Sequence, residues 1–310
     1  LRASSRREDV VELAVKVAKA ALPPEARFAV RCKRVGKHEY SSQELAKLIG
    51  RAVLKELRSL GVRVDLDRPE VVVGVEVRGE DAYVYVGERE GPRGLPLGCQ
   101  GRVVCLMSDG LRSPVAAWMS MKRGCMPILL HFNLEPYMSP EEALRPSRAL
   151  ASWTPRGRLK LYVARHGEVL RRVEGFGRPH LTCLLCRRAM LRVARRLAEL
   201  KGSLGLVTGD VVGEPPSQTL NDLLLMDEAA GGMQVYRPLA GMDGAQVEAL
   251  AKRVGTYEAS AWLEASCPAA PRGLEARASL AEVVEAEEAL SLKEAALEEA
   301  ERLEEKVVEA

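Results

Sequence analysis

The sequence has few aromatic residues and no long hydrophobic run. Phe, Trp and Tyr make up 4% of its 310 residues, so base stacking on aromatic rings is not expected to dominate recognition of a nucleic acid. No stretch of roughly 18 uncharged apolar residues occurs, and Leu1 and Arg2 do not begin a signal peptide. We therefore expect a cytoplasmic protein that does not enter a membrane.

The cysteines show no pattern of a disulfide framework. The seven cysteines are an odd number spread along the chain, which argues against a disulfide framework and favours metal, cluster or sulfur-transfer use of some of them. Hydrophobic residues make up 47% and charged residues 29%, as is typical of a folded globular protein. The length allows about two domains.

Charge is distributed unevenly along the chain. The formal net charge of +3 combines about +4 for residues 1–100, about +6 for residues 101–270 and about −7 for residues 271–310. A basic body followed by an acidic tail can attract RNA, although many proteins that bind no nucleic acid carry a similar charge.

Residues 1–98 are predicted to form a small α+β domain. Apolar positions at helical spacing indicate a helix over 8–21, and Ser41 or Ser42 is expected to cap a second helix that runs to about Leu60. Short strands are predicted at 27–32, 70–77 and 82–86. Turn-forming residues from Gly91 to Gly98 read as a linker and put the domain boundary there.

Residues 99–278 show the alternation of strands and helices that is typical of a parallel α/β sheet. Such sheets bind ligands at the carboxyl ends of their strands. The strands are predicted at 103–107, 127–132, 159–163 and 204–207, and the helices at 114–122, 183–200 and 244–254. The last segment, 279–310, is predicted to be one acidic amphipathic helix that packs on the body or on a second copy in a homodimer.

A candidate phosphate site follows the first of these strands. Ser108, Asp109, Gly110, Leu111, Arg112 and Ser113 form a polar loop that opens a helix. Backbone N–H groups at such a helix N-terminus bind anionic oxygens. An ordinary strand-to-helix turn has the same topology, so topology alone leaves both interpretations open.

A second candidate site is the pair Cys183 and Cys186. Their spacing puts both sulfurs on one face of a helix. Taken alone, the pair indicates either half of a zinc site or two cysteines of a hydrophobic core.

Several segments together resemble the tRNA 4-thiouridine synthetase family. The stretch from Val103 to Gly124 is similar to its PP-loop, with Pro114-Val115-Ala116-Ala117 and Met121-Lys122-Arg123-Gly124 after the loop. Further similar segments lie along the rest of the chain: Thr208-Gly209-Asp210, Ser217-Gln218-Thr219, Arg237-Pro238-Leu239, Gly241-Met242-Asp243 and Gly255-Thr256-Tyr257-Glu258. Upstream, Phe28-Ala29-Val30-Arg31, Lys33 to His38 and Ser42-Gln43-Glu44-Leu45 resemble its THUMP domain.

The resemblance implies a fold and an activity. A THUMP domain would precede a PP-loop ATP-pyrophosphatase domain of the adenine nucleotide alpha hydrolase-like type, with the family's preceding ferredoxin-like domain mostly missing. ATP with Mg²⁺ would adenylate a tRNA uridine at O4, and sulfur would then replace that oxygen and release AMP.

The resemblance also assigns residues to the nucleotide and the RNA. ATP would be bound by Ser108, Asp109, Gly110, Leu111, Arg112, Ser113, His131, Phe132, Thr208, Gly209, Asp210 and Gln218. The tRNA phosphates would be bound by Arg31, Lys33, Arg34 and Lys37, for which a merely solvated surface is the alternative.

Three cysteines would carry the sulfur chemistry. Archaeal-type members without a rhodanese domain hold an iron–sulfur cluster on residues that match Cys183, Cys186 and Cys267. Sulfide or a cysteine desulfurase would then be the sulfur donor. A persulfide on Cys267, resolved by Cys183 or Cys186, is the alternative for protein without metal.

Two positions depart from the family's pattern. Asp109 replaces a glycine and Arg112 replaces an aspartate, and a carboxylate near pyrophosphate would cost on the order of a kcal/mol. Arg112 could offset this cost by pairing with Asp109 or with phosphate. The competing hypotheses are a tRNA-binding protein that has lost the ATP step and a thiolase that acts on another base.

Overall fold

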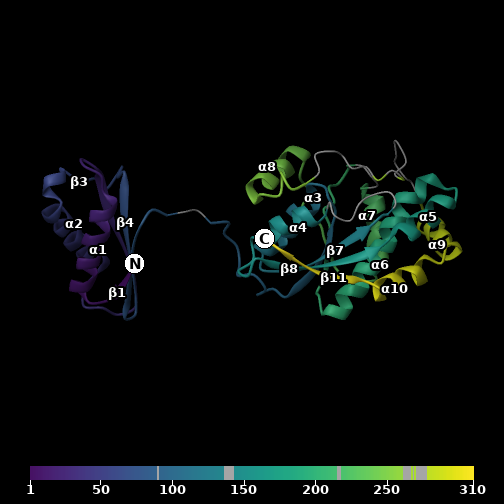
Figure 1. Cartoon of the computed structure of the whole chain (residues 1–310), viewed down its shortest axis with the longest axis horizontal. Helices are drawn as coiled ribbons and strands as arrows, with labels where there is room; N and C mark the ends of the chain where they lie inside the picture. The colour runs from purple at the N-terminus through teal and green to yellow at the C-terminus, as the bar shows by residue number, and fades with distance from the viewer. Residues whose placement is uncertain (89–90, 136–142, 215–217, 261–266, 268, 270–277) are drawn as a thin grey trace. The chain divides into compact units, whose positions relative to one another are not determined.

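The chain divides into two compact units, Leu1–Gly91 and Pro92–Ala310 (Figure 1). The computed structural model describes residues 1–88, 91–135, 143–214, 218–260, 267, 269 and 278–310. The division falls at the start of the turn-rich stretch expected to be a linker, a few residues before the predicted boundary at 98. Residues 279–310, predicted to be a separate acidic helix that packs on the body or on a second copy, belong to the second unit.

The first unit is a five-stranded sheet, in the order β1-β5-β4-β2-β3, with two helices on one face. Alternate strand residues such as Phe28 and Val75 point to the helices and are fully buried, as the pattern of a one-sided sheet requires. The elements are β1 (Arg2–Ser4), α1 (Arg7–Ala21), β2 (Arg27–Val35), α2 (Ser42–Glu56), η1 (Arg58–Leu60), β3 (Arg63–Val64), β4 (Val71–Arg78) and β5 (Asp81–Val86).

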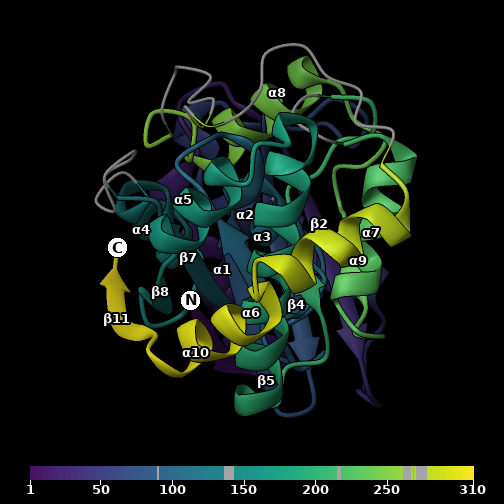
Figure 2. The same cartoon turned by 90° about the vertical axis from the view of Figure 1, so that its right-hand side faces the viewer.

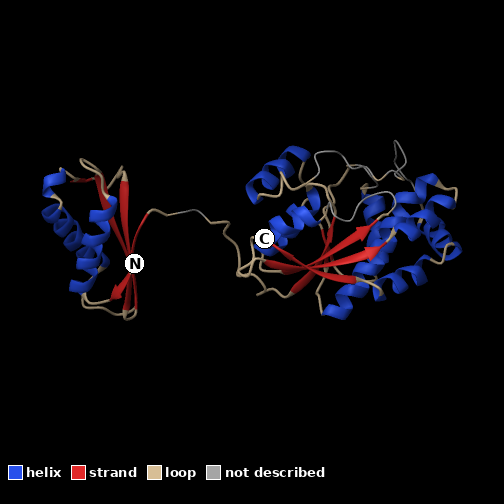
Figure 3. Cartoon of the chain, in the orientation of Figure 1, coloured by secondary structure: helices blue, strands red, loops and turns tan. Residues whose placement is uncertain are grey.

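The second unit is a sheet between two layers of helices, as Figure 3 shows by colour. The strand order is β10-β9-β6-β7-β8-β11, and the first five strands pair in parallel. The expected parallel α/β architecture is thereby confirmed. The strands are β6 (Arg102–Met107), β7 (Met126–Asn133), β8 (Arg158–Arg165), β9 (Leu206–Val207), β10 (Val235–Tyr236) and β11 (Glu304–Glu309).

Alternate residues of the central strands feed two separate cores. Val103 and Cys105 pack with α3, α4 and α8, whereas Val104 and Leu130 pack with α5, α6, α7, α9 and α10. Strands that are buried on both faces explain why the sequence shows near-continuous apolar runs here. The helices are α3 (Arg112–Lys122), α4 (Leu144–Ala151), α5 (Gly167–Gly175), η2 (Pro179–Leu181), α6 (Thr182–Lys201), α7 (Leu220–Ala229), α8 (Gly244–Val254), α9 (Leu280–Ala289) and α10 (Leu292–Glu301).

The prediction of a single acidic helix over 279–310 is wrong. The segment forms α9 and α10, which lie across α6 in Figure 2, and then the edge strand β11. β11 pairs antiparallel with β8, and Lys160 Nζ lies 2.6 Å from Glu305 Oε1 across that pair. The acidic residues of this segment pack on the second unit because α6 and β8 carry arginines and lysines at positions where they form ion pairs with them.

Among the described residues, no helix combines the length and the apolar character that a membrane crossing needs.

Candidate nucleotide and sulfur site

The loop between β6 and α3 is closed by its own serines. The Ser108 N–H donates to Ser113 Oγ at 2.9 Å, and the two hydroxyl oxygens lie 3.0 Å apart. At the N-cap of α3, Leu111 offers no side-chain hydrogen bond to the first turn. The first N–H groups of a helix need acceptors from outside it, so this loop presents donors suited to an anion.

The two unusual loop residues are accommodated without backbone strain. Asp109 does not adopt a positive φ, a conformation that only Glu25, Arg93 and Ser291 show among the described non-glycine residues. Its side chain is buried. Arg112 forms an ion pair with Glu214, which sequence reasoning did not foresee.

The end of β9 packs directly on this loop. A Cβ built on Gly209 would lie 2.9 Å from the Ser113 amide nitrogen and 3.1 Å from Arg112 Cβ. Only glycine permits so close an approach of two backbones. Thr208, Gly209 and Asp210, more than ninety residues from the loop in sequence, are therefore brought beside it at the carboxyl edge of the sheet.

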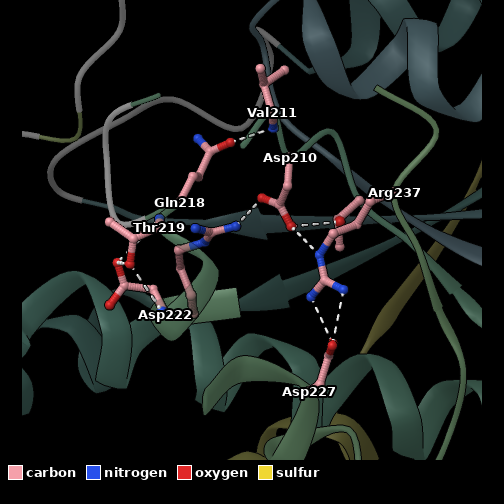
Figure 4. A network of polar contacts seen from close by, with 9 residues as sticks. Asp210, Val211, Gln218, Thr219, Asp222, Asp227 and Arg237 are labelled. Carbon is pink, nitrogen blue, oxygen red and sulfur yellow. Dashed lines mark hydrogen bonds and ion pairs between the residues drawn. The ribbon is translucent and has the colours of Figure 1, made fainter. Parts of the chain in front are cut away.

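Asp210 is the centre of a polar network (Figure 4). One carboxylate oxygen accepts from the Thr208 hydroxyl at 2.7 Å and from Arg237 Nε at 3.2 Å, and the other pairs with Arg187. Burial by itself would raise the pKa of Asp210, but the arginines and Thr208 outweigh burial and lower the pKa. Arg237 also binds Asp227, to which its Nη2 donates at 2.7 Å from Oδ1.

Gln218 supports the backbone beside this network. Its Oε1 accepts from the Val211 N–H at 2.5 Å, and Thr219 begins α7 with a capping box that includes Asp222. Ser217, which belongs to the same family-like segment, lies outside the described residues.

His131 is tied to the end of β6. Its Nδ1 lies 3.0 Å from the Met107 carbonyl oxygen, and burial lowers the pKa of His131 despite that hydrogen bond. Phe132, the next residue, points to the opposite face and packs against His166, so His131 and Phe132 face different sides of the sheet.

The three cysteines predicted to handle sulfur lie near one another. Cys183 and Cys186 are one turn apart on α6. Burial raises the pKa of Cys183 to about 12, and the neighbouring Cys186 and Cys267 add to that shift. Within the described part of the chain, however, no three His, Cys, Asp or Glu side chains are grouped closely enough to hold a metal ion.

The predicted RNA-binding residues are divided between two faces. Arg31 and Lys33 lie on the exposed side of β2, where Arg31 donates to the Leu66 carbonyl at 2.6 Å. Arg34 lies on the opposite face of β2 and donates to the Gly36 carbonyl at 2.8 Å. Lys37 is exposed in the loop that follows β2. The cluster in the sequence is thus not one continuous patch.

Sequence reasoning missed several residues that shape the site. Arg187 directly follows Cys186, yet nothing local indicates that it reaches Asp210. His166, at the end of β8, and Glu299, 133 residues later, form a buried pair. A histidine directly after a parallel strand was the one signal available in the sequence, since strand ends carry function in this architecture.

Comparisons with known families agree with this division of the chain. A family model described as "Thiamine biosynthesis protein (ThiI)" matches residues 98–292, and one described as "THUMP domain" matches residues 5–87. A probable tRNA sulfurtransferase of Methanobrevibacter smithii is 38% identical over 277 residues, which cover 87% of this chain and 71% of that protein. A tRNA sulfurtransferase of Pyrobaculum aerophilum is 39% identical over a region that covers 78% of this chain and 49% of that protein.

A solved structure is also similar. A crystal structure of a 4-thiouridine synthetase–RNA complex with bound ATP matches with a TM-score of 0.86 and 27% identity. The match covers 100% of this chain and 82% of that one.

Proposed function

This chain belongs to the ThiI family and combines a THUMP domain with a PP-loop domain. On that premise we propose that it is an ATP-dependent tRNA sulfurtransferase that forms 4-thiouridine. The relatives named tRNA sulfurtransferase and the ATP-bound 4-thiouridine synthetase–RNA complex support the reaction class. The observation that carries the proposal in this chain is the close packing of Gly209 on Ser113, which assembles a donor-rich loop at the carboxyl edge of the sheet.

ATP is proposed to bind at the loop from Ser108 to Ser113. The uncapped first turn of α3 would bind phosphate oxygens through backbone N–H groups. Arg112 would exchange Glu214 for phosphate and so offset the carboxylate of Asp109. This exchange gives the replacement of an aspartate by arginine a role in nucleotide binding.

The magnesium ion that accompanies ATP is part of this proposal. Mg²⁺ in nucleotide sites is held by phosphate oxygens and one or two carboxylates. Asp210 does not fit such a ligand, because both its oxygens are engaged by Arg187, Arg237 and Thr208.

The reaction is proposed to proceed in two stages at this edge of the sheet. Attack of the uridine O4 on the α-phosphate of ATP would release pyrophosphate and leave an adenylated base. Sulfur would then attack C4, and AMP would depart with the original oxygen. Asp210, Arg187 and Arg237 would fix the wall of the base and nucleotide pocket.

The sulfur centre is proposed to consist of Cys183, Cys186 and Cys267. Three thiols fit an iron–sulfur cluster in donor type. Burial, and to a smaller extent the neighbouring Cys186 and Cys267, raise the pKa of the Cys183 thiol. Such a cluster would supply an iron position able to hold sulfide. Arg187 follows Cys186 directly and pairs with Asp210, so α6 connects the cysteines to the nucleotide pocket.

The tRNA is proposed to contact the exposed face of β2 through Arg31 and Lys33. Phosphate contacts of this kind fix the position of an RNA without reading its sequence. The aromatic content of 4% favours recognition of a folded shape over base stacking.

The test of the proposed function is pyrophosphate release from ATP with and without tRNA. We expect release that requires tRNA and that, at limiting ATP, is reduced in the variant Gly209→Ala. Binding of ATP and tRNA without any pyrophosphate would instead support the hypothesis of a tRNA-binding protein that has lost the ATP step.

A further inference from the structure

The open face of the first unit's sheet carries two tyrosines. The helices α1 and α2 cover one face of that sheet, as Figure 3 shows. Tyr83 and Tyr85 of β5 point to the other face, because Ala82 and Val84, which alternate with them, are buried under the helices. Tyr83 is 40% exposed. Side chains two residues apart on a strand stand about 7 Å from each other, so the two rings are neighbours.

The ring of Tyr85 is held in place by a glycine of the neighbouring strand. Gly74 of β4 stands opposite Tyr85, and a Cβ built on Gly74 would lie 2.4 Å from Cε2 and 2.5 Å from Cζ of that ring. The ring therefore lies over the backbone of β4, in space that any other residue at position 74 would occupy. A ring fixed in this way loses little conformational freedom when a ligand binds to it.

The surroundings of the two rings are basic. The three rows of the sheet from Asp81 to Tyr85 hold four cations and two carboxylates on this face: Arg2, Arg31, Lys33 and Arg78 against Glu76 and Asp81. Asp81 pairs with Arg2 at 2.8 Å and Glu76 with Arg78 at 2.6 Å. Arg31 and Lys33 form no ion pair with a described residue, so the face has an excess of two positive charges that suits an anionic partner.

We propose that Tyr83 and Tyr85 stack on unpaired bases of an RNA whose phosphates lie beside Arg31 and Lys33. Aromatic rings flanked by cations on an open sheet are the combination with which proteins hold single-stranded RNA. The inference deepens the proposed tRNA binding and rests on it only for the identity of the RNA. Two rings serve one or two bases, so contacts with the shape and the phosphates supply the rest of the recognition, in line with an aromatic content of 4%.

The test measures binding of the full chain to two fluorescently labelled RNAs of equal length, a single strand and a blunt-ended duplex, by anisotropy. Tyr83→Leu keeps an apolar side chain but removes the ring, so it should weaken binding of the single strand at least about fivefold and leave the duplex unchanged. Tyr83→Phe should bind both RNAs like the wild-type protein. Lys33→Gln should weaken both equally and lower the salt dependence by about one phosphate contact. Lys55→Gln, on α2 at the opposite face, should change neither.

A second variant, Gly74→Ala, displaces the Tyr85 ring without removing an aromatic residue and should also weaken binding of the single strand selectively. Equal losses for the single strand and the duplex in Tyr83→Leu, or a loss as large in Tyr83→Phe, would overturn the inference. A dimer in sedimentation experiments that Tyr83→Leu abolishes would assign the face to a second copy of the chain and would overturn it too. The expected binding pattern in a wild-type protein that cannot thiolate tRNA would overturn the proposed function alone.

Discussion

Gly209 lies so close to Ser113 that a Cβ on the glycine would sit 2.9 Å from the serine amide nitrogen. The contact joins the end of β9 to the first turn of α3, which presents the uncapped N–H groups of the proposed phosphate site. The geometry of that site therefore depends on the absence of a side chain at Gly209.

The variant Gly209→Ala should weaken ATP binding while the fold survives. Inserting a methyl group into packed structure costs about 1–3 kcal/mol, which corresponds to roughly 5- to 150-fold in affinity if the loop absorbs it. Calorimetric titration with ATP measures the effect. Gly244→Ala is the control, because a Cβ there meets nothing within 4 Å. An equal loss of ATP affinity in Gly209→Ala and Gly244→Ala would contradict the role assigned to the packing of Gly209.

The variant Glu214→Gln should strengthen ATP binding. It removes the carboxylate that competes with phosphate for Arg112, and both partners of that ion pair are partly exposed. Ion pairs of this kind contribute about 0.2–1 kcal/mol, so we expect a gain of roughly up to fivefold. The same titration, repeated in Arg112→Gln, should show no gain from Glu214→Gln. A gain that persists without Arg112 would show that the effect has another cause.

Removing the charge of Asp210 should destabilise the second unit at neutral pH. Asp210→Asn leaves Arg187 and Arg237 without a buried counter-charge, a change that typically costs about 3–5 kcal/mol. Because the pKa of Asp210 is lowered in the fold, its contribution is present above its ordinary pKa of 3.8 and is lost as the pH falls through the lowered value. The thermal unfolding temperatures of the wild-type protein and of Asp210→Asn should converge as the pH falls below about 4. A difference in unfolding temperature that stays constant at acid pH would refute this role of the Asp210 charge.

The attachment of the C-terminal segment depends on Glu287 of α9. Arg188 is fully buried on α6, and its Nε lies 2.9 Å from Glu287 Oε1. Glu287→Ala should cost about 3–5 kcal/mol because it removes the buried carboxylate from that guanidinium, which then keeps only the half-exposed Glu228 as a counter-charge. Glu285→Ala, on the same helix but with an exposed side chain paired to Arg178, should cost less than about 1 kcal/mol. Similar unfolding curves for the two variants would contradict the account.

Local patterns in the sequence were enough to predict the elements that form the proposed nucleotide site. The apolar run that ends at Met107, the small polar residues after it and the helix from Arg112 are all short-range signals, and each has its counterpart in the structure. The periodicity of the apolar residues likewise indicated the parallel sheet.

Long-range charge pairing is what the sequence did not reveal. Residues 304–309 have the composition of a solvated helix, yet they form a strand. Arg158 of β8 stands opposite Glu309 and pairs with it, and Lys160 pairs diagonally with Glu305. The pair His166 and Glu299 and the ion pair of Arg112 with Glu214 are equally non-local. No periodicity or spacing encodes contacts between residues that lie so far apart along the chain.

The most direct test of the central claim is an anaerobic thiolation assay with unmodified tRNA, ATP and sulfide, read by mass spectrometry of the digested nucleosides. The account predicts 4-thiouridine that requires ATP, is abolished in Cys183→Ala, Cys186→Ala and Cys267→Ala, and is retained in Cys32→Ala. Wild-type protein that binds ATP and tRNA but forms no thiolated nucleoside, or that forms it equally well without these cysteines, would contradict the claim.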